Sequence, residues 1–211
     1  MMTNKSIWGP LFALILIVLS LFYYVGYNYY ERENSFKYAK GWNEGRSDIV
    51  RETNKIKELE QKDLKEAIHQ WIYANHEKVS REIIDTIVNE AFNTNYPIMI
   101  LAIIGAESNF VATARSSAGA MGLGQIMPKV YSELLKKEGI IKEIRDLYNI
   151  TENIKAIEFA LKYELKITKG DINKALVRYS GNATHYVQKV MTNYISLSFI
   201  ERRVDLKYVT N

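Results

Sequence analysis

The 211-residue sequence contains no cysteine, three histidines and three prolines. Without cysteine the chain can form neither disulfides nor thiolate metal sites, although a chain of this length can rely on its hydrophobic core. His69 and His76 could share one helix face, but a pair at that spacing is more often incidental than a set of zinc ligands. The composition therefore excludes a disulfide scaffold and gives no indication of a metal site.

The sequence also lacks alternating strand patterns, internal repeats and low-complexity segments. Its eleven glycines and three prolines argue against long disordered tracts. Apolar residues recur at helical spacing instead. We expect a mostly α-helical fold, with helices over residues 81–94, 97–107, 128–137, 152–169, 171–179 and 183–203. Ser80 and Thr151 are the expected N-caps of the first and fourth of these helices.

One apolar run lies near the N-terminus. Residues 7–25 form nineteen positions without a charged side chain, which is long enough to cross a bilayer as a helix. Tyr23 to Tyr30 contain five tyrosines, whose rings favour the membrane–water interface. A cleavable signal peptide would have a shorter apolar region and a small-x-small site, and none follows Ser20. We predict a transmembrane anchor over residues 1–30.

The rest of the chain divides by composition. Residues 31–79 are polar and charged, with apolar residues at irregular helical spacing, which predicts a helical stalk or linker. We expect one domain over residues 80–203 and a tail over residues 204–211. The net charge of +4 and the pI near 9.0 suit an anionic partner such as a cell-wall polymer or a lipid headgroup.

A single carboxylate, Glu107, ends an otherwise apolar helix that opens at Pro97. Ile98 to Ala106 contain no charged side chain, so this helix should be buried on every face. Burial favours the protonated form of Glu107, and a negative charge is disfavoured at a helix C-terminus. Both effects raise the pKa of Glu107, as a general acid requires. Taken alone, however, Glu107 could equally be a surface residue on the last turn of a core helix.

Four separated motifs favour the catalytic interpretation. They are Glu-Ser-Asn-Phe at 107–110, the serine- and glycine-rich run 116–128, Asn-Ile at 153–154 and Arg-Tyr-Ser-Gly at 178–181. Their order and spacing over residues 80–196 resemble the lytic transglycosylase family with a soluble-transglycosylase-type catalytic domain. That family is similar in fold to goose-type lysozyme, so the resemblance implies a lysozyme-like α-helical domain.

The resemblance also implies a reaction and a site. One glutamate protonates the β-1,4 bond between N-acetylmuramic acid and N-acetylglucosamine in peptidoglycan, then accepts the proton of the muramoyl 6-hydroxyl, which leaves a 1,6-anhydro end. No metal or organic cofactor is needed, and no nucleic-acid partner is expected. The catalytic residues would be Glu107 and Tyr179, and the substrate-binding residues would be Ser108, Ser116, Gly122, Gln125, Met127 and Ser180.

Several of these residues have structural alternatives. Ser108 could cap the helix, Gln125 could satisfy backbone groups, and Tyr179 could belong to the core. Two positions also depart from the family pattern. Gly124 replaces a methionine, which predicts looser packing in the groove, and Arg178-Tyr179-Ser180 replaces Ala-Tyr-Asn.

Two other functions stay open at this point. A muramidase on the same fold would need a second carboxylate, and the candidates Glu133, Glu138, Glu143 and Asp146 lie in polar stretches without a special setting. An inactive domain could instead bind glycan within an envelope-spanning or virion assembly. We expect an enzyme of bacterial or phage origin, anchored in the cytoplasmic membrane by residues 7–25, with its catalytic domain on the periplasmic or external side.

Overall fold

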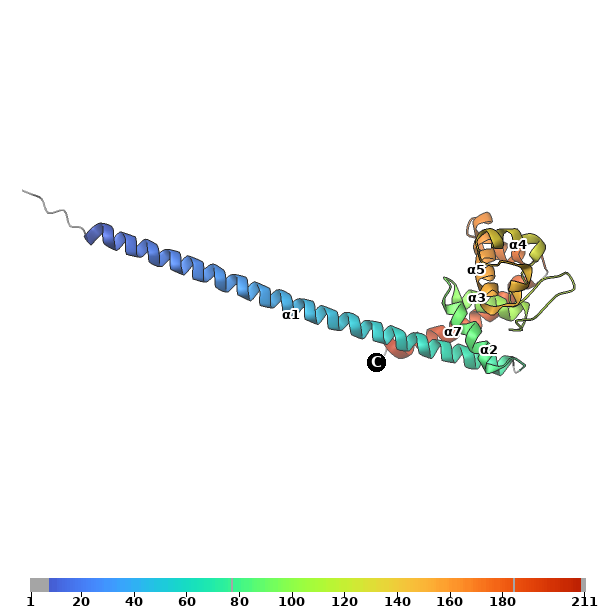
Figure 1. The fold of residues 1–211 in the computed structure, drawn as a ribbon. Coiled ribbons are helices and arrows are strands. Elements are labelled where there is room, and N and C mark those ends of the chain that lie inside the picture. Colours follow the sequence, from blue (N-terminus) through green and yellow to red (C-terminus); the bar gives the residue numbers. More distant parts are fainter. Residues whose placement is uncertain (1–7, 77, 184, 210–211) are drawn as a thin grey trace, which may run out of the picture. The chain divides into compact units, whose positions relative to one another are not determined.

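The computed structural model describes the backbone of residues 8–76, 78–183 and 185–209. It leaves out the side chains of residues 8–19, 21, 22, 36, 38 and 209. The described residues form seven α-helices and one 3-10 helix (Figure 1). They contain no β-strand, only the isolated bridges Arg115–Met121 and Met121–Ile126. The prediction of a mostly α-helical fold is therefore confirmed.

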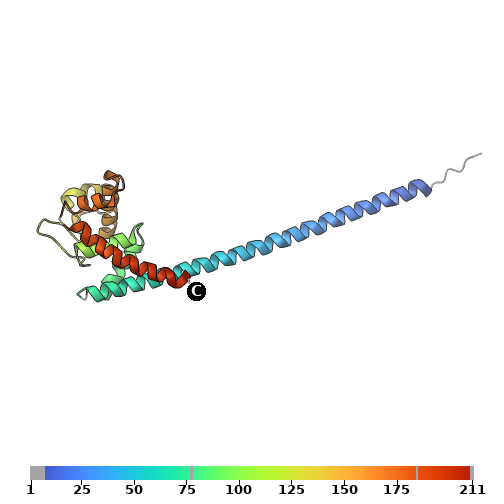
Figure 2. The same ribbon diagram turned by 180° about the vertical axis from the view of Figure 1, so that it is seen from behind.

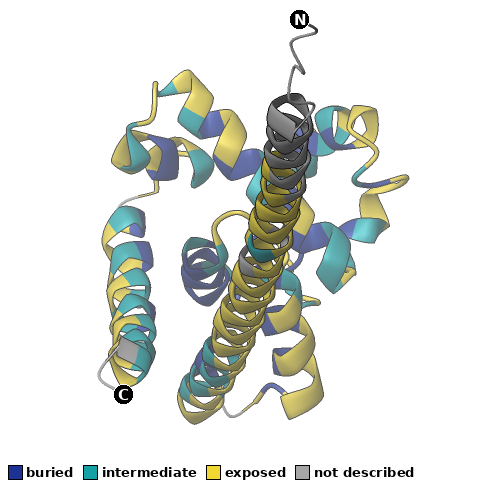
Figure 3. Ribbon diagram, turned by 90° about the vertical axis from the view of Figure 1, so that its left-hand side faces the viewer, coloured by how far each residue is buried: buried dark blue, intermediate teal, exposed yellow. Residues whose placement is uncertain are grey.

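The chain divides into two units, residues 1–57 and residues 58–211. The first unit consists of the larger part of helix α1 (Trp8–Asn75), and almost all its described side chains are exposed (Figure 3). Among the residues whose side chains are described, no helix is long and apolar enough to cross a membrane. The predicted span, residues 7–25, lies mostly outside those residues, so the anchor stays a prediction.

The second unit is built around helix α3 (Pro97–Glu107). Pro97 occupies its first turn, where the missing N–H costs nothing, and Ile98 and Ile100 to Ala106 are all buried. Helices α2 (Arg81–Phe92), α5 (Ile150–Ile167) and α7 (Tyr186–Val209) pack against α3, and Figure 2 shows α7 running across the unit. Each buried Ile or Leu stabilises the fold by about 1.5–3 kcal/mol, so α3 is a major apolar support of this unit.

The last turns of α1 belong to the second unit. Leu64, Ile68 and Ile72 follow one another at four-residue spacing and are buried in the same core as α3. At the other end of the chain, the Tyr208 hydroxyl donates to Asp63 Oδ2 at 2.9 Å. The unit thus begins at Glu58, while the predicted functional boundaries at residues 30, 79 and 203 stay predictions.

The remaining elements are short: two lie between α3 and α5, and one follows α5. They are α4 (Pro128–Lys137), the 3-10 helix η1 (Ile144–Tyr148) and α6 (Ile172–Tyr179). Ser80 caps α2 as predicted, because its hydroxyl accepts from the Ile83 N–H. The prediction of Thr151 as the N-cap of α5 is wrong. Asn149 is the cap, and its side chain accepts from the Thr151 N–H at 3.0 Å. Helix α7 also begins later than expected, at Tyr186.

Candidate active site

Glu107 is the last residue of α3, and the chain turns away immediately after it. The Ser108 N–H closes the helix by donating to the Ile104 carbonyl at 3.0 Å. Asn109 and Phe110 then have φ angles of 50° and 65°, in the left-handed region that non-glycine residues seldom adopt. The Phe110 side chain is fully buried. A buried aromatic ring thus stabilises the sharp turn that leaves the Glu107 side chain at the end of an apolar helix.

The surroundings of Glu107 favour its protonated form. Burial raises its pKa from an ordinary value of 4.5 to about 7, although the Tyr186 hydroxyl and the Lys189 charge both act to lower it. Lys189 itself donates to the Ala106 carbonyl at the end of α3, where a cation also balances the helix dipole. The desolvation of the carboxylate therefore outweighs both favourable neighbours. At neutral pH a substantial fraction of the protein carries a neutral Glu107.

Glu107 lines a cleft of about 560 Å³. Five of the predicted substrate-binding and catalytic residues line the same cleft, namely Ser116, Gln125, Met127, Tyr179 and Ser180. The other lining residues are Ala118, Ala120, Lys129, Val130, Tyr131, Glu164, Arg178, Gly181 and Asn182. Four elements far apart in sequence, α3, α4, α5 and α6, thus contribute to one cleft.

Ser108 and Gly122 are not among the described residues that line this cleft. Ser108 is 7% exposed, and its hydroxyl donates to the Ile104 carbonyl at 3.2 Å. Gly122 has a φ of 74°, and a Cβ there would lie 2.1 Å from the Leu147 carbonyl oxygen. Both residues therefore have structural roles, and their contact with substrate stays a prediction.

Asn153 organises the glycine-rich loop from inside. Its side chain is almost fully buried, its Oδ1 accepts from the Gly124 N–H at 2.9 Å, and its Nδ2 donates to the carbonyls of Met121 and Leu147. One buried side chain thus links two backbone groups of the glycine-rich loop to the Leu147 carbonyl of η1. This contact explains why the Asn-Ile motif and the glycine-rich motif occur together in the sequence.

Gln125 and Ser116 support the loop where it faces the cleft. Gln125 Nε2 donates to the carbonyls of Ala114 and Gly122, at 3.1 and 2.9 Å. The Ser116 hydroxyl accepts from the Ala120 N–H at 3.0 Å. The alternative reading of Gln125, that it satisfies backbone groups, is therefore confirmed. A role of either residue in binding sugar stays a prediction.

Tyr179 reaches the loop from α6. Its hydroxyl donates to the Gly124 carbonyl at 2.8 Å, and burial, with the nearby Glu107 charge as a smaller cause, raises its pKa. The same contact accounts for the glycine at position 124. A Cβ there would lie 2.2 Å from Ile157 Cγ1 and 2.9 Å from the Tyr179 hydroxyl. Ile157 thus occupies the space that a side chain at position 124 would need, while the looser saccharide packing predicted for Gly124 stays a prediction.

Tyr186 is a site residue that the sequence did not reveal. Its ring stacks on that of Tyr179, with centroids 6.3 Å apart, and its hydroxyl is buried without a regular hydrogen-bond partner among the described residues. The hydroxyl is nevertheless close enough to lower the pKa of Glu107, while burial raises the pKa of Tyr186 itself. Tyr186 is therefore a neutral, buried hydroxyl beside Glu107. Its only sequence signal is its place at the start of the last predicted helix.

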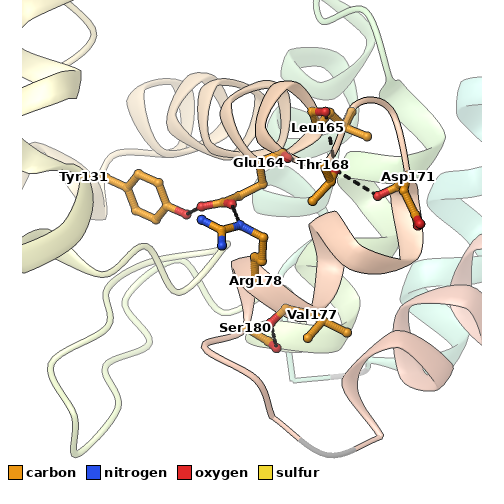
Figure 4. A network of polar contacts seen from close by, with 8 residues as sticks. All are labelled: Tyr131, Glu164, Leu165, Thr168, Asp171, Val177, Arg178 and Ser180. Carbon is orange, nitrogen blue, oxygen red and sulfur yellow. Dashed lines mark hydrogen bonds and ion pairs between the residues drawn. The ribbon is translucent and has the colours of Figure 1, made fainter.

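A second buried carboxylate, Glu164 of α5, was also missed. Glu164 is 4% exposed, and each of its oxygens has a partner (Figure 4). Oε1 accepts from the Tyr131 hydroxyl at 2.9 Å, and Oε2 accepts from Arg178 Nε at 2.5 Å. No pattern in the sequence indicates a role for Glu164, because its partners come from α4 and α6 and meet it only in the folded protein.

No group of three or more His, Asp or Glu side chains among the described residues could hold a metal ion. The site thus combines a carboxyl group of raised pKa, buried tyrosine hydroxyls and an ion pair around one cleft. A carboxyl group that is partly protonated at neutral pH is suited to proton transfer.

The comparison with known families agrees with this geometry. The family model of the transglycosylase SLT domain matches residues 87–196, just over half of the chain. That segment begins in α2 and ends in α7, so it includes every residue that lines the cleft. The family consists of glycan-cleaving enzymes that act on peptidoglycan. The chain therefore belongs to the SLT-domain lytic transglycosylase family.

Proposed function

We propose that the protein is a lytic transglycosylase that cleaves the β-1,4 bond between N-acetylmuramic acid and N-acetylglucosamine, with Glu107 as the acid and then the base. The observation that carries the proposal is the pKa of Glu107, raised to about 7 by burial in the cleft. An ordinary glutamate would be almost fully ionised at neutral pH and could not donate a proton.

In the first step, neutral Glu107 protonates the glycosidic oxygen, and the bond from that oxygen to the anomeric carbon breaks. The resulting carboxylate is the form that Lys189 and the Tyr186 hydroxyl favour, since both lower the pKa of Glu107. In the second step, the muramoyl 6-hydroxyl attacks the anomeric carbon and gives its proton to Glu107. One C–O bond is broken and one is formed, the acid is restored, and water is not consumed.

An intramolecular nucleophile has an advantage over water. The 6-hydroxyl is attached to the reacting sugar, so its attack requires no second molecule to be captured and oriented. The products are therefore expected to be 1,6-anhydromuropeptides.

A hydrolase on the same fold is the second candidate, because Glu164 lines the same cleft. A hydrolase uses a second carboxylate as a base or a nucleophile. Both oxygens of Glu164, however, already accept hydrogen bonds, from Tyr131 and Arg178. A carboxylate in such a pair is a poor base, which favours the transglycosylase.

Digestion of purified sacculi in oxygen-18 water, followed by mass spectrometry of the muropeptides, separates the two reactions. A transglycosylase incorporates no label at the new muramic acid end. Label in most of the product would instead assign the protein as a hydrolase, and Glu164→Gln would then be the first variant to examine.

The membrane anchor is a separate proposal, supported by the nineteen uncharged residues at positions 7–25 and by the location of peptidoglycan outside the cytoplasmic membrane. The full chain should sediment with membranes and resist extraction by high salt. Release by salt alone, or a mature N-terminus near Tyr30, would contradict it. Membership in an envelope-spanning or virion assembly is compatible with such an anchor.

A further inference from the structure

Arg178 stands at a position where the family resemblance implies alanine, and it places a positive charge in the wall of the cleft. Its side chain is 47% exposed, whereas the side chain of its partner Glu164 is 5% exposed. The ion pair, drawn in Figure 4, thus has a buried anion and a partly exposed cation that lines the cleft. The glycan backbone of peptidoglycan is neutral, so cleavage of the glycosidic bond alone gives no reason for this charge.

The guanidinium is held in one orientation. Its Nε donates to Glu164 Oε2 at 2.5 Å, and the other oxygen of Glu164 is held by the Tyr131 hydroxyl at 2.9 Å. Among the described residues, the two terminal amino groups of Arg178 have no hydrogen-bond partner. A guanidinium fixed through Nε still offers two parallel donors, which is the geometry that binds a carboxylate through both oxygens.

The turn between α5 and α6 supports this orientation. The Thr168 hydroxyl, at the end of α5, lies within hydrogen-bonding distance of the carbonyls of Glu164 and Asp171, at 2.9 and 3.0 Å. The Asp171 side chain then caps α6 by accepting from the Lys174 N–H at 3.1 Å. The two helices are therefore joined by a short, well-bonded turn, and Arg178 on α6 faces Glu164 on α5 (Figure 4).

The balance of charge in the cleft also favours an anion. Arg178 and Lys129 are the cations among its described lining residues, and Glu107 and Glu164 are the acids. Glu164 is already neutralised by Arg178, and Glu107 is partly protonated at neutral pH, since its pKa is about 7. A substrate with carboxylates in addition to its sugars would complement this cleft better than a neutral one.

We propose that Arg178 binds a carboxylate carried by the muramic acid unit, on its attached peptide, and that it makes the enzyme select peptide-bearing strands. This inference rests on the proposed function. The lactyl group that joins the peptide to the sugar is a second source of the same chemistry, because it becomes a free carboxylate when the peptide is removed. In this role Arg178 sets specificity and takes no part in proton transfer.

The test compares Arg178→Gln with the wild type on two substrates, peptide-bearing glycan and the same glycan stripped of peptide by an amidase. Loss of a charge-assisted hydrogen bond corresponds to about tenfold or more in kcat/KM. We expect that loss on peptide-bearing glycan, mainly in KM, and little change on stripped glycan. A loss on stripped glycan alone would assign the lactyl carboxylate as the ligand, whereas an equal loss on both substrates would show that neither carboxylate is recognised and would overturn the proposal. No loss on either would overturn the proposal.

A second, independent experiment removes the charge from the substrate instead of from the protein. The carboxylates of the peptide are converted to uncharged amides by coupling them to an amine that carries no other charge. On this modified substrate, kcat/KM of the wild type should fall by the same factor by which Arg178→Gln lowers it on the native substrate. For the variant, kcat/KM should be the same on the modified and the native substrate. Additive losses would show that Arg178 and the carboxylate do not interact, and would also overturn the proposal. If the wild type cleaves none of these substrates, the proposed function fails instead, and binding of muropeptides to Glu107→Gln with and without Arg178→Gln still tests the inference.

Two further variants separate recognition from folding. Arg178→Gln leaves Glu164 buried without its cation, so the double variant Glu164→Gln/Arg178→Gln, which removes both charges, should show the same substrate preference as the single variant. Arg178→Lys should restore part of the selectivity through its charge. Lys174→Gln is the matched control, because Lys174 lies on the same helix but pairs with Asp171 at 2.9 Å and does not line the cleft.

Discussion

Two glutamates line one cleft and have opposite surroundings. Glu107 comes from the end of an apolar helix, and burial raises its pKa to about 7. Glu164 is buried more deeply, yet each of its oxygens accepts a hydrogen bond, from Tyr131 and from Arg178. Burial without a firm partner makes a proton donor, whereas burial with partners on both oxygens makes a fixed support. The depth of burial alone would have assigned the two roles the wrong way round.

The largest expected effect tests Glu107 as the acid. Glu107→Gln keeps the shape of the side chain but cannot transfer a proton, so turnover should fall by about 10²–10⁴-fold. Release of muropeptides from sacculi measures it, and glycan binding should be kept. Glu133→Gln is the matched control, because the Glu133 side chain is 86% exposed. Activity of Glu107→Gln comparable to that of the wild type would remove Glu107 from the mechanism.

The same variant should be more stable than the wild type at high pH. The folded-state pKa of Glu107 is raised from 4.5 to about 7, so its contribution to stability is fully present below pH 4.5 and is lost as the pH rises toward 7. Glutamine does not titrate, and the stability advantage of Glu107→Gln should therefore grow by about 3 kcal/mol over this range. Urea unfolding at pH 4.5 and pH 8 measures the difference, and a constant difference would mean that Glu107 is solvated.

The pH dependence of activity follows from the same shift. Because the first step needs neutral Glu107, kcat/KM of the wild type should fall above the pKa of about 7, and by about fiftyfold between pH 7 and pH 9. Initial rates on soluble glycan strands give the profile. A profile that falls from pH 5 would correspond to an ordinary glutamate and would contradict the buried acid.

Tyr131→Phe tests whether Glu164 is held in place by its hydrogen-bond partners. This change removes the hydroxyl that donates to Glu164 Oε1 at 2.9 Å, and a buried hydrogen bond to a charged group contributes about 1.5–3 kcal/mol. The free energy of unfolding should fall by that amount. Tyr163→Phe is the control, since Tyr163 packs beside Tyr131 and is 39% exposed. Equal effects of the two changes would mean that Glu164 does not depend on Tyr131.

The smallest expected effect comes from Tyr179→Phe. The change removes the hydrogen bond to the Gly124 carbonyl, a neutral pair that contributes about 0.5–1.5 kcal/mol. Stability and turnover should both fall, and turnover much less than in Glu107→Gln. Turnover lost as completely as in Glu107→Gln would instead place Tyr179 in direct contact with the reacting atoms.

Part of the site could be predicted from the sequence because its residues are close neighbours along the chain. Pro97, the apolar run after it and Glu107 lie within eleven residues, and their periodicity alone predicts a buried helix with an acid at its end. The glycine-rich loop was recognisable for the same reason, since the required glycines are neighbours. Asn149, the true N-cap of α5, was missed because Asn and Thr are both good caps and lie two residues apart.

The rest of the site depends on contacts between distant segments. Tyr131, Glu164 and Arg178 are separated by 33 and 14 residues, so no spacing along the chain indicates that they meet. Gly124 is explained by Ile157 and Tyr179, from α5 and α6, whose side chains leave no room for a Cβ at position 124. The sequence by itself determined the helices and the acid, because propensity and periodicity act over a few residues. Only the tertiary structure decided which carboxylate has partners, since desolvation and pairing depend on what the other helices place beside it.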